Sequence, residues 1–307
     1  MTTPAVSACI ITFNQEPYIE QAVQSALNQT ASFEYEVVVA DDCSTDATPE
    51  ILARLERAHR PRLRVILREK NLGVTANLAA ALQECRGKYI ALLEGDDYWA
   101  DPSKLQRQHD ALETNLDCAI CFHPVKVLRE GRLIATTPKH VPKRTNLADL
   151  LGRGNYIPTP SVMFRNRVQE GFPPWFFDLR IGDLPLNVMN ARFGDILMLD
   201  RPMAVYRIHT GGTFSSLPNA ARVEAVVRMY DGVDELLGRR YTRIISGVQS
   251  YWRAVQQFER GEIATARALA RRRLAAPPWN SARLMAGIMA YFPRLYRIIR
   301  KIRPAPP

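Results

Sequence analysis

Short apolar runs alternate with helical periodicity through the first third of this 307-residue chain, and no other feature constrains the fold as strongly. Between the runs, apolar residues recur at helical spacing. The runs themselves cover residues 6–11, 35–40, 63–67 and 89–93. Strand-helix-strand units of this length predict an α/β fold with a mainly parallel sheet and helices on both faces.

Polar residues follow three of these predicted strands. Asn14 comes after the first strand, Asp41 and Asp42 close the second, and Asp96 and Asp97 come after the fourth. In open parallel sheets, ligands bind beyond the carboxyl ends of the strands. Two adjacent carboxylates at the end of a buried strand repel each other unless a positive group lies between them. The sequence therefore predicts a ligand site at this edge.

The pattern changes after residue 117. Residues 118–128 and 132–136 resemble longer strands on either side of a turn at Glu130-Gly131. Residues 137–160 form a predicted loop with a short helix, and the chain beyond residue 219 is helical throughout. We therefore expect a domain at 1–218, with halves at about 1–117 and 118–218, and a helical region at 219–307.

The composition excludes several classes of protein. A chain that is 47% hydrophobic and 23% charged is neither disordered nor fibrous. No apolar stretch approaches the roughly 20 residues of a membrane span, and the first residues lack the basic flank of a secretion signal, so we expect a cytoplasmic protein. The five scattered cysteines suit a reducing compartment. Cys118 and Cys121 lack a second pair, which favours packed thiols over a metal site.

The formal net charge of +10 is concentrated near the end of the chain. Nine basic residues and no acidic ones lie between residues 271 and 303, namely Arg271, Arg272, Arg273, Arg283, Arg294, Arg297, Arg300, Lys301 and Arg303. The rest of the chain is close to neutral, so we expect no nucleic-acid partner.

Four short motifs follow one another: Ile10-Ile11-Thr12-Phe13-Asn14, Val39-Ala40-Asp41-Asp42-Cys43-Ser44-Thr45-Asp46, Asn71-Leu72-Gly73 and Glu94-Gly95-Asp96-Asp97. Together they resemble the ordered signature of family 2 glycosyltransferases with the GT-A fold, over about residues 5–217. Two later blocks, at 182–186 and 205–212, are also similar to that family. The resemblance implies a GT-A domain with a donor half and an acceptor half, followed by a C-terminal helical extension.

The same resemblance implies the reaction. An inverting, metal-dependent enzyme of this family moves one sugar from a nucleotide-diphosphate sugar to a hydroxyl of a glycan, lipid-linked or protein acceptor. Such enzymes serve cell-surface polysaccharide, lipid-linked glycan or glycoconjugate synthesis.

A divalent cation, manganese or magnesium, would separate the paired carboxylates, because both ions prefer oxygen ligands and keep positions open for phosphate. By resemblance Asp97 is the direct ligand, and Asp96 contacts the ribose or reaches the metal through water. His209 would complete the metal sphere or meet a phosphate, and its alternative is ordinary packing. The structural alternative is that both carboxylates cap the next helix.

Further donor-binding residues also follow from the resemblance. Asp42 is expected at the edge of the nucleotide base, with helix capping as its alternative, and Phe13 is expected to stack on the base, with core packing as its alternative. Asn77 lies where some relatives carry a basic residue that touches the phosphates. The full donor-binding set is Thr12, Phe13, Asn14, Glu16, Asp41, Asp42, Asn71, Gly73, Asn77 and Asp96.

A transferase also needs a base for the acceptor hydroxyl. By resemblance this is Asp183, whose alternative role is a helix N-cap ahead of Pro185. Trp99 and Trp175 are candidates for the acceptor side, although core packing would explain them equally well.

Two rival functions use similar residues. A nucleotidyltransferase also employs paired aspartates and a cation, but it would carry a basic, glycine-rich loop after its first strand, and residues 12–16 contain neither glycine nor a basic residue. A non-catalytic nucleotide-sugar-binding module would need neither Asp183 nor His209. Both rivals are therefore disfavoured.

The segment 279–303 alternates apolar and basic residues at approximately helical spacing. Such a pattern is typical of helices that lie in a membrane interface. We expect this segment to attach the protein peripherally to an anionic inner membrane surface. The alternative is a helix that packs on the body, and Pro293 would interrupt the helix in either case.

Overall fold

The structure is a computed structural model that describes residues 3–138, 140–209, 219–277 and 281–302. The chain divides into two compact units. The first holds residues 1–146, 156–177 and 189–209, and the second holds 147–155, 178–188 and 210–307. The predicted boundary after residue 218 adjoins residues outside the described ranges, so the division into 1–218 and 219–307 stays a prediction.

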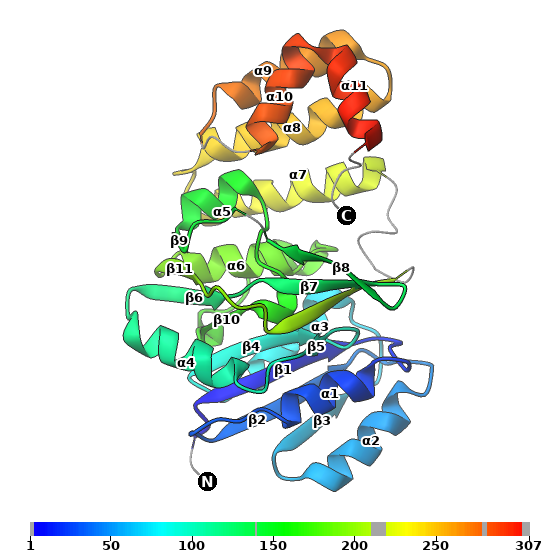
Figure 1. The fold of residues 1–307 in the computed structure, drawn as a ribbon, viewed down its shortest axis with the longest axis vertical. Helices are drawn as coiled ribbons and strands as arrows, with labels where there is room; N and C mark the ends of the chain where they lie inside the picture. The colour runs from blue at the N-terminus through cyan, green and yellow to red at the C-terminus, as the bar shows by residue number, and fades with distance from the viewer. Residues whose placement is uncertain (1–2, 139, 210–218, 278–280, 303–307) are drawn as a thin grey trace. The chain divides into compact units, whose positions relative to one another are not determined.

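The first unit is built on the predicted parallel strands (Figure 1). These are β1 (Val6–Thr12), β2 (Tyr35–Asp41), β3 (Leu63–Leu67) and β4 (Tyr89–Glu94). They pair in parallel in the order β3-β2-β1-β4. Every residue of β2 is buried, as expected for a sheet covered on both faces. The predicted parallel α/β core is confirmed.

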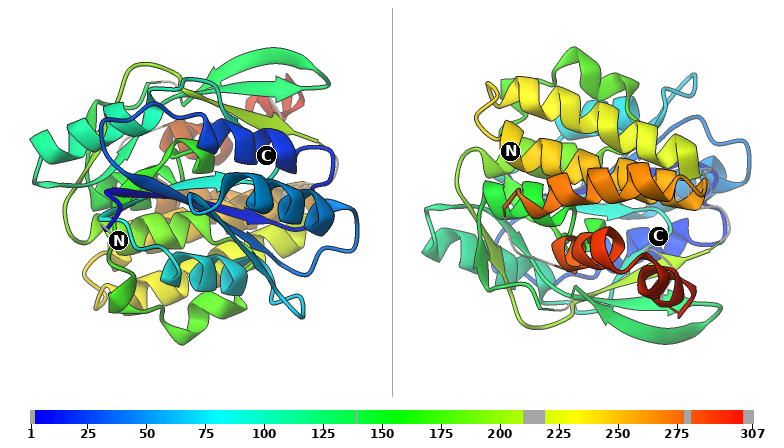
Figure 2. Two further views of the ribbon diagram at one scale, coloured as in Figure 1. Left: turned by 90° about the horizontal axis from the view of Figure 1, so that it is seen from below. Right: turned by 90° about the horizontal axis from the view of Figure 1, so that it is seen from above.

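Helices connect these strands and cover both faces of the sheet. They are α1 (Ile19–Leu27), α2 (Thr48–His59) and α3 (Val74–Gln83), followed after β4 by α4 (Lys104–Thr114). The chain steps outward from β1 to β3 and then returns to β4, and right-handed crossovers therefore place α1 and α3 on opposite faces (Figure 2). The strand order reverses between β1 and β4, which is where open α/β sheets bind ligands.

The register brings the carboxyl ends of the four strands to one level. Thr12 is the Cα partner of Asp41, and Asp41 is the partner of Leu67. On the other side of β1, Ile11 pairs with Glu94. The residues that follow these strands therefore leave the sheet along a common edge.

The remaining strands of the first unit extend this sheet and form a second one. Beyond β4 the order is β10 (Met163–Arg165), β6 (Cys118–Phe122), β11 (Asp195–Met198) and β9 (Arg144–Thr145). The second sheet has the order β5 (Tyr98–Trp99), β12 (Ala204–Ile208), β7 (Val125–Arg129) and β8 (Arg132–Thr137). Short 3₁₀ helices occupy Thr159–Ser161, Val168–Glu170 and Pro174–Asp178.

The single strand predicted at 118–128 is wrong. The chain leaves one sheet after Phe122 and enters the other at Val125, with His123 and Pro124 between them. Proline has no backbone N–H to donate to a ladder, so a continuous strand cannot pass through it in a sheet interior. The predicted hairpin is confirmed, because β7 and β8 pair antiparallel around a turn at 130–131.

The second unit is helical in the residues that the structure covers. It contains α5 (Leu147–Arg153), the start of α6 (Asp183–Ala191), α7 (Asn219–Leu236), α8 (Thr242–Glu259), α9 (Ile263–Leu274), α10 (Ser281–Tyr291) and α11 (Pro293–Ile302). The predicted interruption at Pro293 is confirmed, since α11 begins there. None of the described helices combines the length and apolar character of a membrane span.

One arginine of the basic C-terminal region lies inside the helical unit. Arg273 is completely buried, and its guanidinium donates hydrogen bonds to the carbonyl oxygens of Ala276 (3.1 Å) and Gly152 (3.0 Å). Because it holds α9 against α5, Arg273 does not belong to the basic surface that the sequence suggested.

Candidate active site

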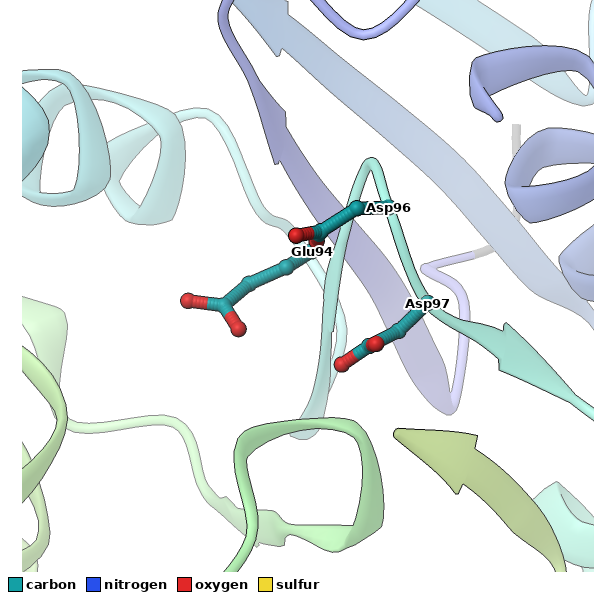
Figure 3. A group of neighbouring side chains, drawn as sticks. All are labelled: Glu94, Asp96 and Asp97. Atoms are coloured by element: carbon teal, nitrogen blue, oxygen red, sulfur yellow. The ribbon is translucent and has the colours of Figure 1, made fainter. Parts of the chain in front are cut away.

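Three carboxylates converge at the end of β4. Oxygens of Glu94, Asp96 and Asp97 lie within 4.8 Å of one another, and the side chains extend to the same side of the turn (Figure 3). Gly95 makes this turn possible, because a Cβ there would lie only 2.5 Å from the Thr12 hydroxyl oxygen. The turn is therefore held tightly against β1. Glu94 was absent from the predicted site, although it opens the same four-residue motif.

Asp97 is fully buried, and its two carboxylate oxygens differ in their partners. Oδ1 accepts a hydrogen bond from the Arg207 backbone N–H at 2.7 Å, whereas Oδ2 is buried with no hydrogen-bond donor among the described residues. Burial, together with the charges of Asp96 and Glu94, raises the pKa of Asp97 well above its usual value. A divalent cation would satisfy Oδ2 and offset the repulsion, so these residues fit the predicted metal.

His209 lies against this acidic turn. Its Nε2 is 2.8 Å from Oδ2 of Asp96, and its ring centroid is 5.3 Å from that of Tyr18. β12 pairs with β5, which follows the turn directly, and so brings residues 204–209 beside the carboxylates. The structure thus brings together two predicted residues that are 113 positions apart. Gly211 and Gly212 of the same motif lie outside the described residues.

Arg207 also contacts the turn, and it was not predicted as a site residue. Its guanidinium donates to the Asp96 carbonyl oxygen and to Oε1 of Gln21 (2.8 Å). It lies 4.4 Å from the ring centroid of Tyr18 and 5.4 Å from that of Tyr98. Its charge opposes the rise in the pKa of Asp97. The 205–212 block contained this residue, but the block alone did not show which way the side chain points.

The loops after β1 and β2 are tied together by side chains. Asn14 Oδ1 accepts the Thr45 backbone N–H at 2.8 Å, and Glu16 Oε2 accepts that of Ala47 at 3.3 Å. Asn14 has a positive φ of 52°, which asparagine tolerates better than most residues. Phe13, just before Asn14, is 44% exposed. Its ring is therefore not part of the core and is available for stacking.

The two aspartates at the end of β2 hold neighbouring loops. Asp42 Oδ1 accepts the backbone N–H of Leu72 at 2.7 Å, and its Oδ2 accepts that of Gly73 at 3.0 Å. Asp41 accepts both the backbone N–H and the hydroxyl of Ser44. Burial raises the pKa of Asp41, and the bonds from Ser44 oppose this rise. Neither aspartate caps α2, because the Thr48 N–H is bound by Asp46 instead.

Other predicted donor residues position the same loops. Asn71 donates to the Asp42 carbonyl oxygen at 3.0 Å, and Gly73 has a φ of 87°, which favours glycine. Asn77 is buried and donates to the Ala40 carbonyl oxygen at 3.1 Å, which ties α3 to β2. Thr12 is buried against Gly95. These contacts shape the edge of the sheet. Direct contact between these residues and a nucleotide-sugar donor stays a prediction.

Asp183 belongs to the second unit, at the first residue of α6. Its Oδ1 accepts the Leu184 backbone N–H at 2.8 Å, and its Oδ2 accepts a hydrogen bond from Asn155. Burial raises the pKa of the Asp183 carboxyl against both of these bonds. A raised pKa suits a general base, and a place at a helix start suits the capping alternative, so the predicted role stays open.

The two tryptophans differ in their surroundings. Trp99 is 4% exposed, its Nε1 donates to the Pro160 carbonyl oxygen at 2.9 Å, and the Lys104 ammonium lies 4.1 Å from its ring centroid. This is the core packing that stood as the alternative to an acceptor role. Trp175 is partly exposed on a 3₁₀ helix, and its acceptor role stays a prediction.

The sequence of this chain is similar to that of other proteins. Uncharacterized protein Rv1520 of Mycobacterium tuberculosis (strain ATCC 25618 / H37Rv) is 39% identical over 216 residues, which are 69% of this chain and 61% of that protein. The chain therefore spans less than two thirds of this relative's length.

Among solved structures, the chain is similar to S. aureus TarS 1–349 in complex with UDP-GlcNAc. The TM-score is 0.61 at 20% identity, and the match covers 96% of this chain and 90% of that one. It is also similar to the mannosyltransferase PcManGT from Pyrobaculum calidifontis in complex with GDP-Man and Mn²⁺, with a TM-score of 0.58 at 17% identity over 98% and 84% of the two chains. Both similarities concern the fold, which is of the expected GT-A type.

Residues 7–172 match the sequence model described as glycosyl transferase family 2. This match spans more than half of the chain and includes all four motifs, the last of which is the acidic turn. The chain belongs to glycosyl transferase family 2.

Proposed function

We propose that this chain is an inverting glycosyltransferase that moves a single sugar from a nucleotide-diphosphate sugar to an acceptor hydroxyl. One observation carries the proposal: a family 2 chain presents three converging carboxylates where the strand order reverses, and a buried Asp97 oxygen there has no donor among the described residues. Paired acids at this position suit a cation that holds a diphosphate.

Glu94, Asp96 and Asp97 would hold manganese or magnesium, with His209 beside them. When bound, the cation would supply Lewis-acid stabilisation to the departing diphosphate. PcManGT in complex with GDP-Man and Mn²⁺ and TarS in complex with UDP-GlcNAc support a nucleotide-sugar donor and, in the first case, a cation. In this chain, the exposed Phe13 ring would stack on the nucleotide base.

Asp183 serves as the general base in this proposal. It takes the proton of the acceptor hydroxyl, the oxygen bonds to the anomeric carbon, and the bond from that carbon to the diphosphate breaks. A single displacement of this kind inverts the anomeric centre. The raised pKa of the partly buried carboxyl supports this role, because a stronger base removes a hydroxyl proton more readily.

The acceptor belongs to a cell-surface polysaccharide, a lipid-linked glycan or another glycoconjugate, and the protein works at the cytoplasmic face of a membrane. Support comes from α10, α11 and the residue between them, where large apolar side chains are exposed beside basic ones, namely Leu284, Tyr291, Phe292, Leu295 and Ile298. Arg294 and Arg297 on α11 are exposed as well. Such a surface suits an interface with anionic lipid.

A panel of sugar nucleotides tests the central claim. The protein is incubated with each donor and manganese, and the released nucleoside diphosphate is measured with and without EDTA. We expect release from at least one donor and its loss in EDTA. If no donor is consumed and none shifts the melting temperature, the protein is not a transferase.

A further inference from the structure

Tyr18 immediately precedes α1 and was not among the predicted site residues. Its backbone N–H donates to the Gln15 carbonyl oxygen at 2.9 Å, and its carbonyl oxygen accepts the Ala22 N–H at 3.1 Å, so its main chain is fixed at the start of the helix. Its side chain makes no capping hydrogen bond among the described residues and is partly exposed. Neither helix capping nor core packing therefore accounts for a tyrosine at this position.

The Tyr18 ring contacts two residues at the end of β12. The Arg207 guanidinium carbon lies 4.4 Å from the ring centroid, within the range of a cation–π contact. The His209 ring centroid lies 5.3 Å away at an interplanar angle of 49°, within the range of aromatic pairs. Residues two positions apart on a strand share one face, so a single ring can meet both side chains.

The same two residues also contact the acidic turn. The Arg207 guanidinium donates to the Asp96 carbonyl oxygen, and the Arg207 backbone N–H donates to Oδ1 of Asp97 at 2.7 Å. His209 Nε2 lies 2.8 Å from Oδ2 of Asp96. The Tyr18 ring is therefore linked to the proposed cation site through Arg207 and His209.

Arg207 brings a positive charge beside the carboxylates without pairing with them. Its guanidinium binds a backbone oxygen of the turn and Oε1 of Gln21 (2.8 Å), and among the described residues no carboxylate lies within ion-pair distance of it. Gln21 is three positions after Tyr18, so one turn of α1 presents the ring and the amide oxygen on the same face. A guanidinium pairs readily with carboxylates, so an unrestrained Arg207 would compete with a cation for these oxygens.

We propose that Tyr18 is a positioning residue of the proposed cation site: its ring restrains the Arg207 guanidinium and supports His209, which keeps the carboxylates of the acidic turn open to manganese or magnesium. Without the ring, Arg207 would be able to pair with Asp96 or Asp97 and compete with the cation, since both are attracted to the same oxygens. This inference rests on the proposed function and adds a residue outside the acidic turn that controls its affinity for the cation.

Electron paramagnetic resonance of free Mn²⁺ measures the affinity of the full chain for this ion, with and without UDP or GDP. We expect Tyr18→Leu and Tyr18→Gln to bind Mn²⁺ about tenfold more weakly, because a cation–π contact is lost and a competing guanidinium is released. Tyr18→Phe keeps the ring and should stay within about twofold of the unmodified protein. Arg207→Met in the Tyr18→Leu background removes the competing charge and should restore most of the affinity.

Tyr241→Leu is the matched control. Tyr241 is also a partly exposed tyrosine directly before a helix, α8, and its side chain makes no capping hydrogen bond within the described ranges. It belongs to the second unit, whereas β12 belongs to the first. The Mn²⁺ affinity of this variant should match that of the unmodified protein.

The outcomes separate this inference from the proposed function. Unchanged Mn²⁺ affinity in folded Tyr18→Leu and Tyr18→Gln, an equal loss in Tyr241→Leu, or no recovery on adding Arg207→Met overturns the role of Tyr18 and leaves the proposed cation site intact. Absence of Mn²⁺ binding by the unmodified protein, even with UDP or GDP, overturns the proposed function and this inference with it. Circular dichroism shows whether each variant is folded.

Discussion

The acidic turn at 94–97 and the basic helices α10 and α11 each carry an excess of one charge, but they hold it differently. In the turn, three carboxylates converge within 4.8 Å and Asp97 is fully buried. On α11, Arg294 and Arg297 are exposed beside Leu295 and Ile298, which are 47% and 55% exposed. Buried charges that converge require a counter-ion, whereas solvated charges beside apolar side chains form a surface.

Asp97→Asn is the strongest test of the first half of this contrast. We expect metal-dependent turnover to fall by at least about 10³-fold, because the change removes a metal ligand and its charge while keeping its volume. In EDTA the melting temperature should not fall, since the variant also removes a buried and repelled carboxylate.

Donor consumption with manganese and thermal melting in EDTA measure the two effects of Asp97→Asn. Asp110→Asn is the matched control, because Asp110 is an exposed aspartate on α4. Full turnover in Asp97→Asn would show that the Asp97 carboxylate does not bind a cation needed for the reaction.

Asp183→Asn tests whether a single, partly buried carboxylate outside the acidic turn takes part in the reaction. We expect transfer to fall by about 10²-fold, the usual effect of a lost general base, with donor binding nearly unchanged. The pKa of Asp183 is raised, so the rate should decline as the pH falls through that pKa and the base becomes protonated. The variant should lack this acid limb.

Rates across pH and donor calorimetry measure both effects, and Asp178→Asn provides an exposed aspartate of the same unit as control. If the affinity for the donor and the rate of transfer both fell strongly, Asp183 would belong to the donor-binding site and not to the acceptor side.

Substitution of the exposed apolar residues on α11 tests the second half of the contrast. The double change Leu295→Asp with Ile298→Asp should weaken co-sedimentation with anionic liposomes by about tenfold, because it removes apolar contact and adds repelling charge. Raised salt should weaken binding of the unmodified protein too. Point changes are preferable to truncation, since Met289, Ala290 and Tyr296 belong to the core of the helical unit.

Leu116→Asp is the control for these liposome experiments, because Leu116 is 74% exposed in the first unit. Equal sedimentation with neutral and anionic vesicles would show that α11 is an ordinary solvated helix.

Lys104 is buried singly, unlike the three carboxylates of the acidic turn. Its substitution is expected to have the smallest effect of those described. Burial lowers the pKa of Lys104 to about 7, and Nζ has no hydrogen-bond acceptor among the described residues. The unfolded chain retains this proton to higher pH than the folded chain. The free energy of unfolding should therefore rise with pH, by about 1 kcal/mol between pH 7 and 8. Urea unfolding of Lys104→Met should lack this contribution, and an identical pH dependence in both proteins would contradict the low pKa.

The parallel half of the fold could be predicted because its buried strands are continuous apolar runs separated by clear helical periods. The strand at 63–67 was predicted with the bounds that the structure shows. The break at His123-Pro124 was missed because apolar residues continue on both sides of it, and hydrophobic pattern alone does not show that the two halves enter different sheets.

Residues of the candidate site were predictable where a sequence motif contains them, as for Asp96, Asp97 and His209. Contacts made across the sheet edge were not predictable. Asn14 binds the backbone of Thr45, and Asp42 binds that of Leu72 and Gly73, and no local pattern specifies such partners.

The hydrogen bond from the Arg207 backbone N–H to Asp97 has a consequence for folding during synthesis. Arg207 is 110 residues later in the chain, so the acidic turn leaves the ribosome well before the strand that covers it. Until β12 is in place, the carboxylate of Asp97 lacks this donor and remains open to water. A nascent chain that ends at residue 172, where the family match stops, could already form β1 to β4, but it would lack both Arg207 and His209. The proposed cation site, with His209 beside the carboxylates, is therefore complete only once β12 has paired with β5.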